Sequence, residues 1–211
     1  MDCVLLIVAA AITTVGFYKF VYFLSSGYAF AILGLAIALM IGFSGSLTVP
    51  VFILLALVVL YAARLGFFIV IREVKSGAYR TVLSEASTGY DKIPFFVKIA
   101  TWILVSIQYV MQISPVYFRL KNGMQSAHPG WLYAGIIIVA AGFLMQTAAD
   151  AQKNAAKKVN PKTFCREGLF KMVRCPNYFG EILVWTGVLL SSLPCLTGWF
   201  QRVVALLGYI L

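Results

Sequence analysis

The sequence predicts an all-α transmembrane helical bundle of six to seven spans, and three observations support this fold class. The chain has 211 residues, of which 62% are hydrophobic and only 11% are charged, whereas soluble domains carry about 25% charged residues. The apolar residues form long unbroken runs, without the period-two alternation of membrane β-barrel strands. Lysines and arginines gather in the gaps between these runs. Because backbone groups in lipid must be hydrogen-bonded internally, such runs indicate helices.

Each predicted span is an apolar run close to the roughly 20 residues that a membrane-crossing helix needs. The seven runs are Val4–Leu24, Tyr28–Phe43, Leu47–Ile71, Pro94–Phe118, Trp131–Met145, Tyr178–Leu193 and Trp199–Leu211. We expect them to form a single transmembrane domain over residues 1–211. The last run has 13 residues and covers about 20 Å as a helix, less than the roughly 30 Å hydrocarbon core. We therefore expect the final span to be truncated.

The distribution of charge predicts the orientation in the membrane. The formal net charge is +10, and most basic residues lie in two polar loops, 72–93 and 150–174. Two predicted spans separate these loops, so both lie on one side, and the positive-inside rule makes that side cytoplasmic. Counting back three spans places the N-terminus outside. The corresponding membrane is the endoplasmic reticulum in a eukaryote or the inner membrane in a bacterium.

The composition argues against metal and nucleic-acid sites. The four cysteines and the one histidine are Cys3, Cys165, Cys175, Cys195 and His128, and they do not show the clustered short spacings of a zinc site. Neither a Rossmann nor a P-loop glycine motif is present. The basic residues flank apolar runs, which indicates topology rather than nucleic-acid binding. The sequence leaves the oligomeric state open.

The segment from Gly168 to Gly187 places polar groups at the entrance of a span. Glu181 lies inside the apolar run, where a carboxylate costs up to about 2.5–3.5 kcal/mol. Asn177 is four residues before Glu181 and Trp185 is four residues after it, so the three share one helix face. This face meets the basic loop 150–174, which favours a phosphorylated ligand. Alternatively, Glu181 pairs with Arg174 or Arg64 and only joins helices.

The same segment resembles the C-terminal signature of the steroid 5-alpha-reductase family. It reads Gly-Leu-Phe, then Pro-Asn-Tyr-Phe-Gly-Glu at 176–181, then Trp-x-Gly at 185–187, and it is most similar to the family's less characterised membrane relatives. Two outlying pieces agree. Asp150-Ala-Gln-Lys resembles an Ala-Asp-x-Gln segment of the family, and Tyr61-Ala-Ala-Arg64-Leu-Gly resembles its Tyr-x-x-Arg and Arg-Leu-Gly motifs. The resemblance extends over residues 55–211.

This resemblance implies a membrane reductase that uses NADPH to reduce an activated C=C bond of a steroid-like or other lipid. It implies that Asn177 and Glu181 hold the nicotinamide end and that Trp185 lines the same pocket. Asp150 and Lys157 would contact the ribose and phosphate groups, with a two-residue gap in the match at Lys157. The remaining implied cofactor-binding residues are Arg64, Arg174 and Tyr178. Tyr61 would be catalytic, as the donor that stabilises charge on the substrate carbonyl oxygen.

Two departures from the family keep other functions open. The family pairs the tyrosine with a glutamate in the second span, but residues 3–72 contain no acidic residue. The family also has an arginine- and tyrosine-containing tail after the last span, and we expect it to be missing here. One alternative is an S-adenosylmethionine-dependent methyltransferase of the isoprenylcysteine carboxyl type, whose Arg-His-Pro-x-Tyr-x-Gly turn is similar. Another is a non-catalytic, degenerate membrane paralogue that keeps the fold.

Overall fold

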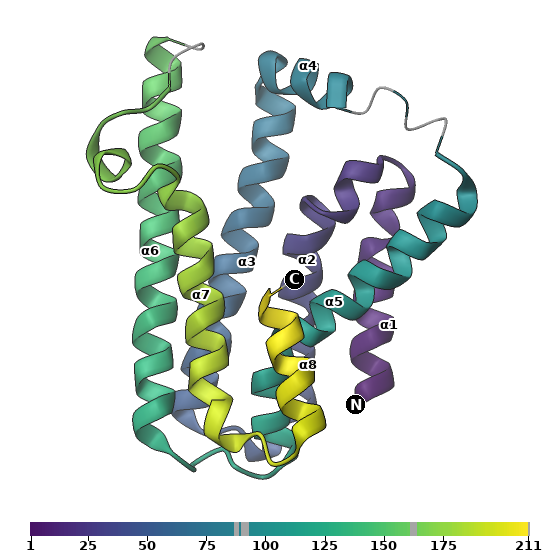
Figure 1. Cartoon of the computed structure of the whole chain (residues 1–211), viewed down its shortest axis with the longest axis vertical. Helices are drawn as coiled ribbons and strands as arrows, with labels where there is room; N and C mark the ends of the chain where they lie inside the picture. Colours follow the sequence, from purple (N-terminus) through teal and green to yellow (C-terminus); the bar gives the residue numbers. More distant parts are fainter. Residues whose placement is uncertain (87–88, 90–92, 161–163, 211) are drawn as a thin grey trace.

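The computed structural model describes residues 1–86, 89, 93–160 and 164–210, and this part of the chain is helical without any β-strand. Figure 1 shows the α-helices running mostly side by side, with α4 across one end. The α-helices are α1 Asp2–Thr13, α2 Ser26–Gly42, α3 Val49–Lys75, α4 Gly77–Ala86, α5 Phe95–Lys121, α6 Pro129–Val159, α7 Pro176–Ser192 and α8 Trp199–Ile210. Short 3₁₀ helices are η1 Thr14–Phe17, η2 Phe20–Phe23, η3 Ser44–Ser46, η5 Gly168–Lys171 and η6 Leu193–Cys195.

Five helical segments of the described chain are long and apolar enough to cross a membrane, which makes the protein a multi-pass membrane protein. They are Phe20–Gly42, Val49–Lys75, Phe95–Lys121, Pro129–Val159 and Pro176–Cys195. The predicted all-α class is confirmed, but the predicted number of six to seven spans exceeds these five. The two remaining apolar helices, Asp2–Phe17 and Trp199–Ile210, are shorter.

The sequence predicts one span over Val4–Leu24, but the structure divides this run into α1, η1 and η2. The chain leaves the helical conformation at Lys19, whose backbone is extended (φ −138°, ψ 122°). On either side, η1 and η2 fold against each other. A Cβ at Gly16 would lie 2.2 Å from the ring of Phe23, so this close approach requires a glycine. The segment thus returns as α2 beside α1 instead of continuing across the membrane.

Helix α6 extends further than its apolar run. It has 31 residues and measures about 46 Å at 1.5 Å per residue, so it exceeds the roughly 30 Å hydrocarbon core. Residues 143–159 contain neither glycine nor proline and are rich in alanine, which favours helix. The beginning of the predicted basic loop 150–174 is therefore the last part of α6, and Asp150 lies on this helix.

The two basic segments lie at the same end of the bundle, as predicted. Helix α4 and the end of α6 with the following loop are both at the top of Figure 1. At the other end, Lys121 Nζ lies 3.0 Å from Asp2 Oδ2, which ties the start of α1 to the end of α5. The assignment of the basic end to the cytoplasm stays a prediction. Three charged residues of these segments, Asp91, Lys92 and Lys162, lie outside the described residues.

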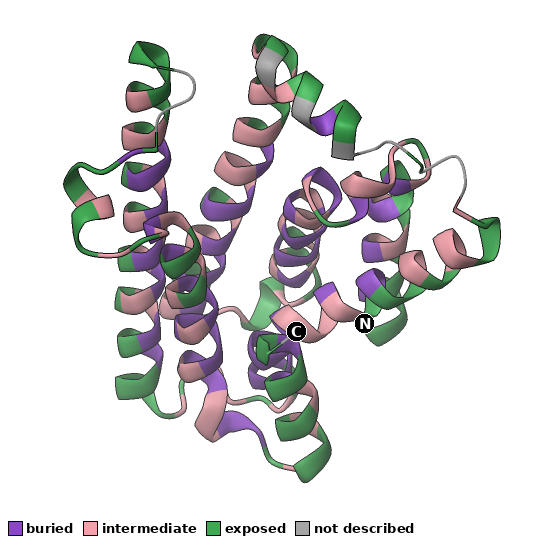
Figure 2. Cartoon of the chain, turned by 45° about the horizontal axis from the view of Figure 1, so that its top comes forward, coloured by how far each residue is buried: buried purple, intermediate pink, exposed green. Residues whose placement is uncertain are grey.

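Apolar side chains occupy both the interior and the outer faces of the bundle. Fully buried residues such as Ile32, Leu54 and Val139 pack between the helices, while Ile41, Ile137 and other large apolar residues point outward. Figure 2 shows this as purple inner faces and green outer faces on the long helices. Exposed apolar faces on this scale fit a hydrocarbon solvent, because the surface of a soluble protein is kept largely polar.

A buried arginine connects three segments at the end opposite the basic loops. The side chain of Arg119 is fully buried on α5. It donates to the carbonyl oxygen of Ser191 at 2.7 Å and to that of Ala127, and its Nη1 lies 3.2 Å from Cys195 Sγ. Carbonyl oxygens at the end of α7 and in the connector after α5 thus replace the water around this cation.

Helices α6 and α7 pack with their backbones in contact through paired glycines. A Cβ added at Gly142 of α6 would lie 2.5 Å from the carbonyl oxygen of Gly180, and one added at Gly135 would lie 2.6 Å from that of Gly187. In the opposite direction, a Cβ added at Gly180 or at Gly187 would lie 2.7 Å from a backbone oxygen of α6. Small residues of this kind let membrane helices approach until their backbones touch.

Replacing Gly142 by alanine is expected to lower the free energy of unfolding by about 1–3 kcal/mol, because the methyl group meets backbone that cannot rotate away. The matched control is Gly130→Ala near the start of α6, where nothing lies within 4 Å of the added Cβ. Thermal unfolding in detergent, followed by circular dichroism, measures both variants. Equal stability of the two variants would contradict this account of the α6–α7 contact.

Candidate active site

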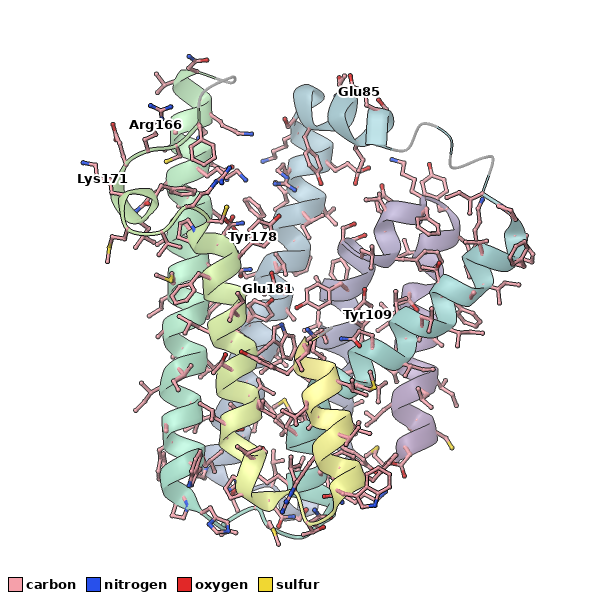
Figure 3. All side chains as sticks on the ribbon, viewed as in Figure 1. Glu85, Tyr109, Arg166, Lys171, Tyr178 and Glu181 are labelled. Atoms are coloured by element: carbon pink, nitrogen blue, oxygen red, sulfur yellow. The ribbon has the colours of Figure 1, made fainter. Side chains whose placement is uncertain are left out.

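A cavity of about 480 Å³ lies between α2, α3, α5, α6 and α7. It is polar in its deeper part and carries two cations toward the basic end of the bundle. In Figure 3, Glu181 and Tyr178 project from α7, and Tyr109 belongs to α5 on the other side of the bundle interior. The polar lining residues are Ser25, Tyr28, Arg72, Gln108, Tyr109, Gln112, Gln146, Asp150, Lys153, Asn177, Tyr178 and Glu181.

The hydroxyl of Tyr28 is the centre of a hydrogen-bonded cluster in this cavity. Tyr28 stands in the first turn of α2 and donates to Glu181 Oε1 at 2.7 Å. The indole Nε1 of Trp185 donates to the same hydroxyl at 2.8 Å, and the hydroxyl of Tyr61 lies 3.2 Å away. Three helices therefore meet at one oxygen atom: α2, α3 and α7.

The structure brings Tyr61, Glu181 and Trp185 together, although they come from distant parts of the sequence. Tyr61 is completely buried, and its ring meets that of Trp185 edge-on at 6.2 Å between centroids. Neither Tyr61 nor Trp185 lines the cavity, whereas Tyr28 does. The sequence reasoning missed Tyr28, since one tyrosine among eleven carries no local signature.

Arg64 and Asp150 form an ion pair between α3 and α6. The distance from Arg64 Nη1 to Asp150 Oδ2 is 2.7 Å, and the same nitrogen donates to Gln146 Oε1 at 3.3 Å. Glu181 accepts from Tyr28 instead, and none of the ion pairs among the described residues includes it. The alternative in which Glu181 pairs with Arg64 or Arg174 is therefore not what the described residues show.

Two cations, Arg72 and Lys153, line the cavity near its basic end. The guanidinium of Arg72 lies 3.9 Å from the ring centroid of Tyr79 and 5.3 Å from that of Phe68. Its Nε is buried and has no hydrogen-bond partner among the described residues. Aromatic stacking thus holds Arg72 in place, with hydrogen-bonding capacity left for an anion.

The predicted cofactor-binding residues are divided by the structure. Asn177, Tyr178, Glu181 and Asp150 line the cavity. The other four lie outside the lining. Lys157 and Arg174 are exposed, Trp185 is buried, and Arg64 pairs with Asp150. Lys153 lies one helical turn before Lys157 and lines the cavity, although the sequence reasoning had not selected it. The roles of all these residues stay predictions.

Fold and site define a class of protein: a multi-pass helical membrane protein with a polar, cation-rimmed cavity inside the bundle. Comparison with known protein families assigns the chain to one family within this class. The family described as "Protein of unknown function (DUF1295)" matches residues 10–211. The chain therefore belongs to the DUF1295 family.

A comparison with curated proteins found a similarity to the steroid 5-alpha-reductase DET2 of Gossypium hirsutum. The two sequences are 41% identical over 56 residues, which are 26% of this chain and 22% of the cotton protein. The alignment thus spans less than a quarter of that relative's length. No solved structure matches the chain.

Removing one member of the Arg64–Asp150 pair is expected to destabilise the protein by about 3–5 kcal/mol, because the remaining charge loses its oppositely charged partner. Asp150→Leu tests this directly. The double variant Arg64→Met/Asp150→Leu is expected to recover most of the loss, since no charge remains. Unfolding in detergent gives the free energies for a double-mutant cycle. Strictly additive effects would mean that the two side chains do not interact.

Proposed function

We propose that this protein is a membrane-embedded, NADPH-dependent reductase that acts on an activated C=C bond of a steroid-like or other lipid. The observation that carries the proposal is the Tyr28–Tyr61–Trp185–Glu181 cluster within a cavity that has Arg72 and Lys153 near its basic end. The partial similarity to a steroid 5-alpha-reductase supports it. By the positive-inside rule, this end of the cavity faces the cytoplasm.

The residues that line the cavity fit a pyridine nucleotide. Arg72, whose Nε has no partner among the described residues, and Lys153 suit the phosphate groups, and Asp150 suits a ribose hydroxyl. Deeper in the cavity, the side-chain amide of Asn177 and the carboxylate of Glu181 complement the donors and acceptors of a nicotinamide amide. When bound, NADPH supplies the hydride for the reduction.

The tyrosine cluster supplies what the lipid half of the reaction needs. Reduction of a C=C bond conjugated to a carbonyl places negative charge on the carbonyl oxygen. A phenol O–H held in a water-poor site stabilises that charge as it forms. The apolar wall of Leu65, Ile69 and Val105 lowers the local polarity, which strengthens such a hydrogen bond. The same wall suits a lipid entering from the hydrocarbon.

NADPH is expected to raise the free energy of unfolding of the detergent-purified protein by about 2.7 kcal/mol at a concentration of 100 times its dissociation constant. NADH and S-adenosylmethionine serve as comparisons in the same thermal-shift measurement. Stabilisation by S-adenosylmethionine alone would replace the reductase by a membrane methyltransferase. No response to any of the three would support a non-catalytic protein.

The phosphate contact is expected to depend on Lys153 and not on Lys157. Lys153→Met removes a charge-assisted hydrogen bond worth about 1.5–3 kcal/mol, so the dissociation constant for NADPH should rise by about 10- to 100-fold. Lys157→Met is the matched control, because this lysine lies on the same helix but is exposed and outside the cavity lining. Titration by thermal shift or by nucleotide fluorescence measures both. A larger loss from Lys157→Met would reverse the assignment.

A further inference from the structure

Two tyrosine hydroxyls lie 3.2 Å apart in the candidate site, but they differ in their access to a ligand. Tyr28 is partly exposed and lines the cavity. Tyr61 is completely buried and is not among the residues that line the cavity. A lipid carbonyl inside the cavity therefore meets Tyr28 and not Tyr61.

We propose that Tyr28 is the catalytic tyrosine, whose hydroxyl contacts the substrate carbonyl and gives up its proton to it, and that Tyr61 is a positioning residue. The proposal rests on the proposed reductase function. It also places a hydroxyl on α2, in a part of the chain that contains no acidic residue. Tyr28 stands only two residues after the start of α2 at Ser26.

The hydrogen-bond pattern explains how Tyr28 can lose a proton inside a membrane protein. Its oxygen accepts from Trp185 Nε1 at 2.8 Å. The Tyr61 hydroxyl lies 3.2 Å from the same oxygen, and either hydroxyl can donate in this contact. Once the Tyr28 proton moves to the substrate, Trp185 and Tyr61 can both donate to the atom on which negative charge develops. Such an arrangement stabilises an oxyanion in the same way as an oxyanion hole.

Glu181 is suited to return the proton to Tyr28. The Tyr28 hydroxyl and Glu181 Oε1 lie 2.7 Å apart, a distance at which a proton can pass directly from the Glu181 carboxyl to Tyr28. The hydride forms a new C–H bond at the β-carbon, and the electron pair of the C=C bond moves to the carbonyl oxygen. That oxygen takes the Tyr28 proton, and Tyr28 takes the proton of Glu181. The resulting enol rearranges to the saturated ketone. Water at the cavity mouth then reprotonates the carboxylate.

The ring of Tyr28 is held by neighbours that do not depend on a ligand. Its centroid lies 5.3 Å from that of Tyr109 on α5 and 6.5 Å from that of Trp185 on α7. Tyr109 is fixed in turn, because its hydroxyl donates to the carbonyl oxygen of Phe23 at 2.5 Å. The donor position is therefore pre-set, as electrostatic stabilisation of a transition state requires.

The test uses full-length protein in detergent and two probes: 4-cholesten-3-one and trans-2-hexadecenal, each with ¹³C at the carbonyl carbon. Difference infrared spectroscopy reports the C=O stretch of the bound probe without any cofactor. Variants are Tyr28→Phe and Tyr61→Phe, with Tyr133→Phe as a control on the exposed face of α6. Turnover with NADPH is measured in parallel on any probe that the wild-type protein reduces.

We expect the C=O stretch to move to lower frequency in the wild type, in Tyr133→Phe and, less strongly, in Tyr61→Phe, but not in Tyr28→Phe. The value of kcat should fall by about 10²–10³-fold in Tyr28→Phe and clearly less in Tyr61→Phe, while stabilisation by NADPH persists in both. A shift that survives in Tyr28→Phe and is lost in Tyr61→Phe would overturn the proposal. So would an unshifted stretch of both probes in the wild type.

A second measurement keeps the test decisive if Tyr28→Phe fails to fold. Replacement of Tyr28 or of Tyr61 by 3-fluorotyrosine keeps the hydroxyl and makes it a stronger donor. The fluorinated residue should lower the C=O stretch further at position 28 than at position 61, and the opposite order would contradict the proposal. Because the infrared signal needs no NADPH, absence of NADPH binding would overturn the reductase function while leaving this assignment decided by its own result.

Discussion

The rest of the site depends on the backbone contact between α6 and α7. Four glycines remove the side chains that would hold the two helices apart, and carbonyl oxygens take their place at the interface. Gln146 and Asp150 on α6 are thereby brought beside Asn177 and Glu181 on α7, and all four line one cavity. In lipid, apolar burial does not drive helix association, so close packing of this kind provides the attraction.

Charged side chains inside the bundle are tolerated where a protein group replaces the water around them. Asp150 pairs with Arg64, Glu181 accepts a hydrogen bond from Tyr28, and Arg119 donates to main-chain carbonyl oxygens. Arg72 differs from these three, since its guanidinium packs against aromatic rings and has no hydrogen bond or ion pair among the described residues. A buried cation of this kind is costly unless an anion completes it. This asymmetry distinguishes a ligand-binding end of the cavity from its structural remainder.

Much of the fold was predictable, because apolar runs report directly on segments that lie in lipid. The face shared by Asn177 and Glu181 followed from a spacing of four residues. Other features required the folded chain. Tyr28 gains its place only from helix packing, and the split of the first run depends on the contact of Gly16 with Phe23. Lys153 and Lys157 are one turn apart on α6. A motif match that needs a two-residue gap cannot tell which of the two lysines corresponds to the family's residue. Only the structure separates the lysine that lines the cavity from the exposed one.

The absence of an acidic residue in the second span now has a physical interpretation. A carboxylate in the middle of an apolar helix costs about 2.5–3.5 kcal/mol, and less toward a helix end. This chain has its carboxylate at Glu181, five residues after the start of α7 at Pro176, and a phenol on α2. The hydrogen bond from Tyr28 to Glu181 joins the two helices, so the acid and the phenol still meet. The pairing of an acid with tyrosine hydroxyls is thus assembled across helices, and the acid lies in a cavity that also contains Arg72 and Lys153, where nearby cations reduce its cost.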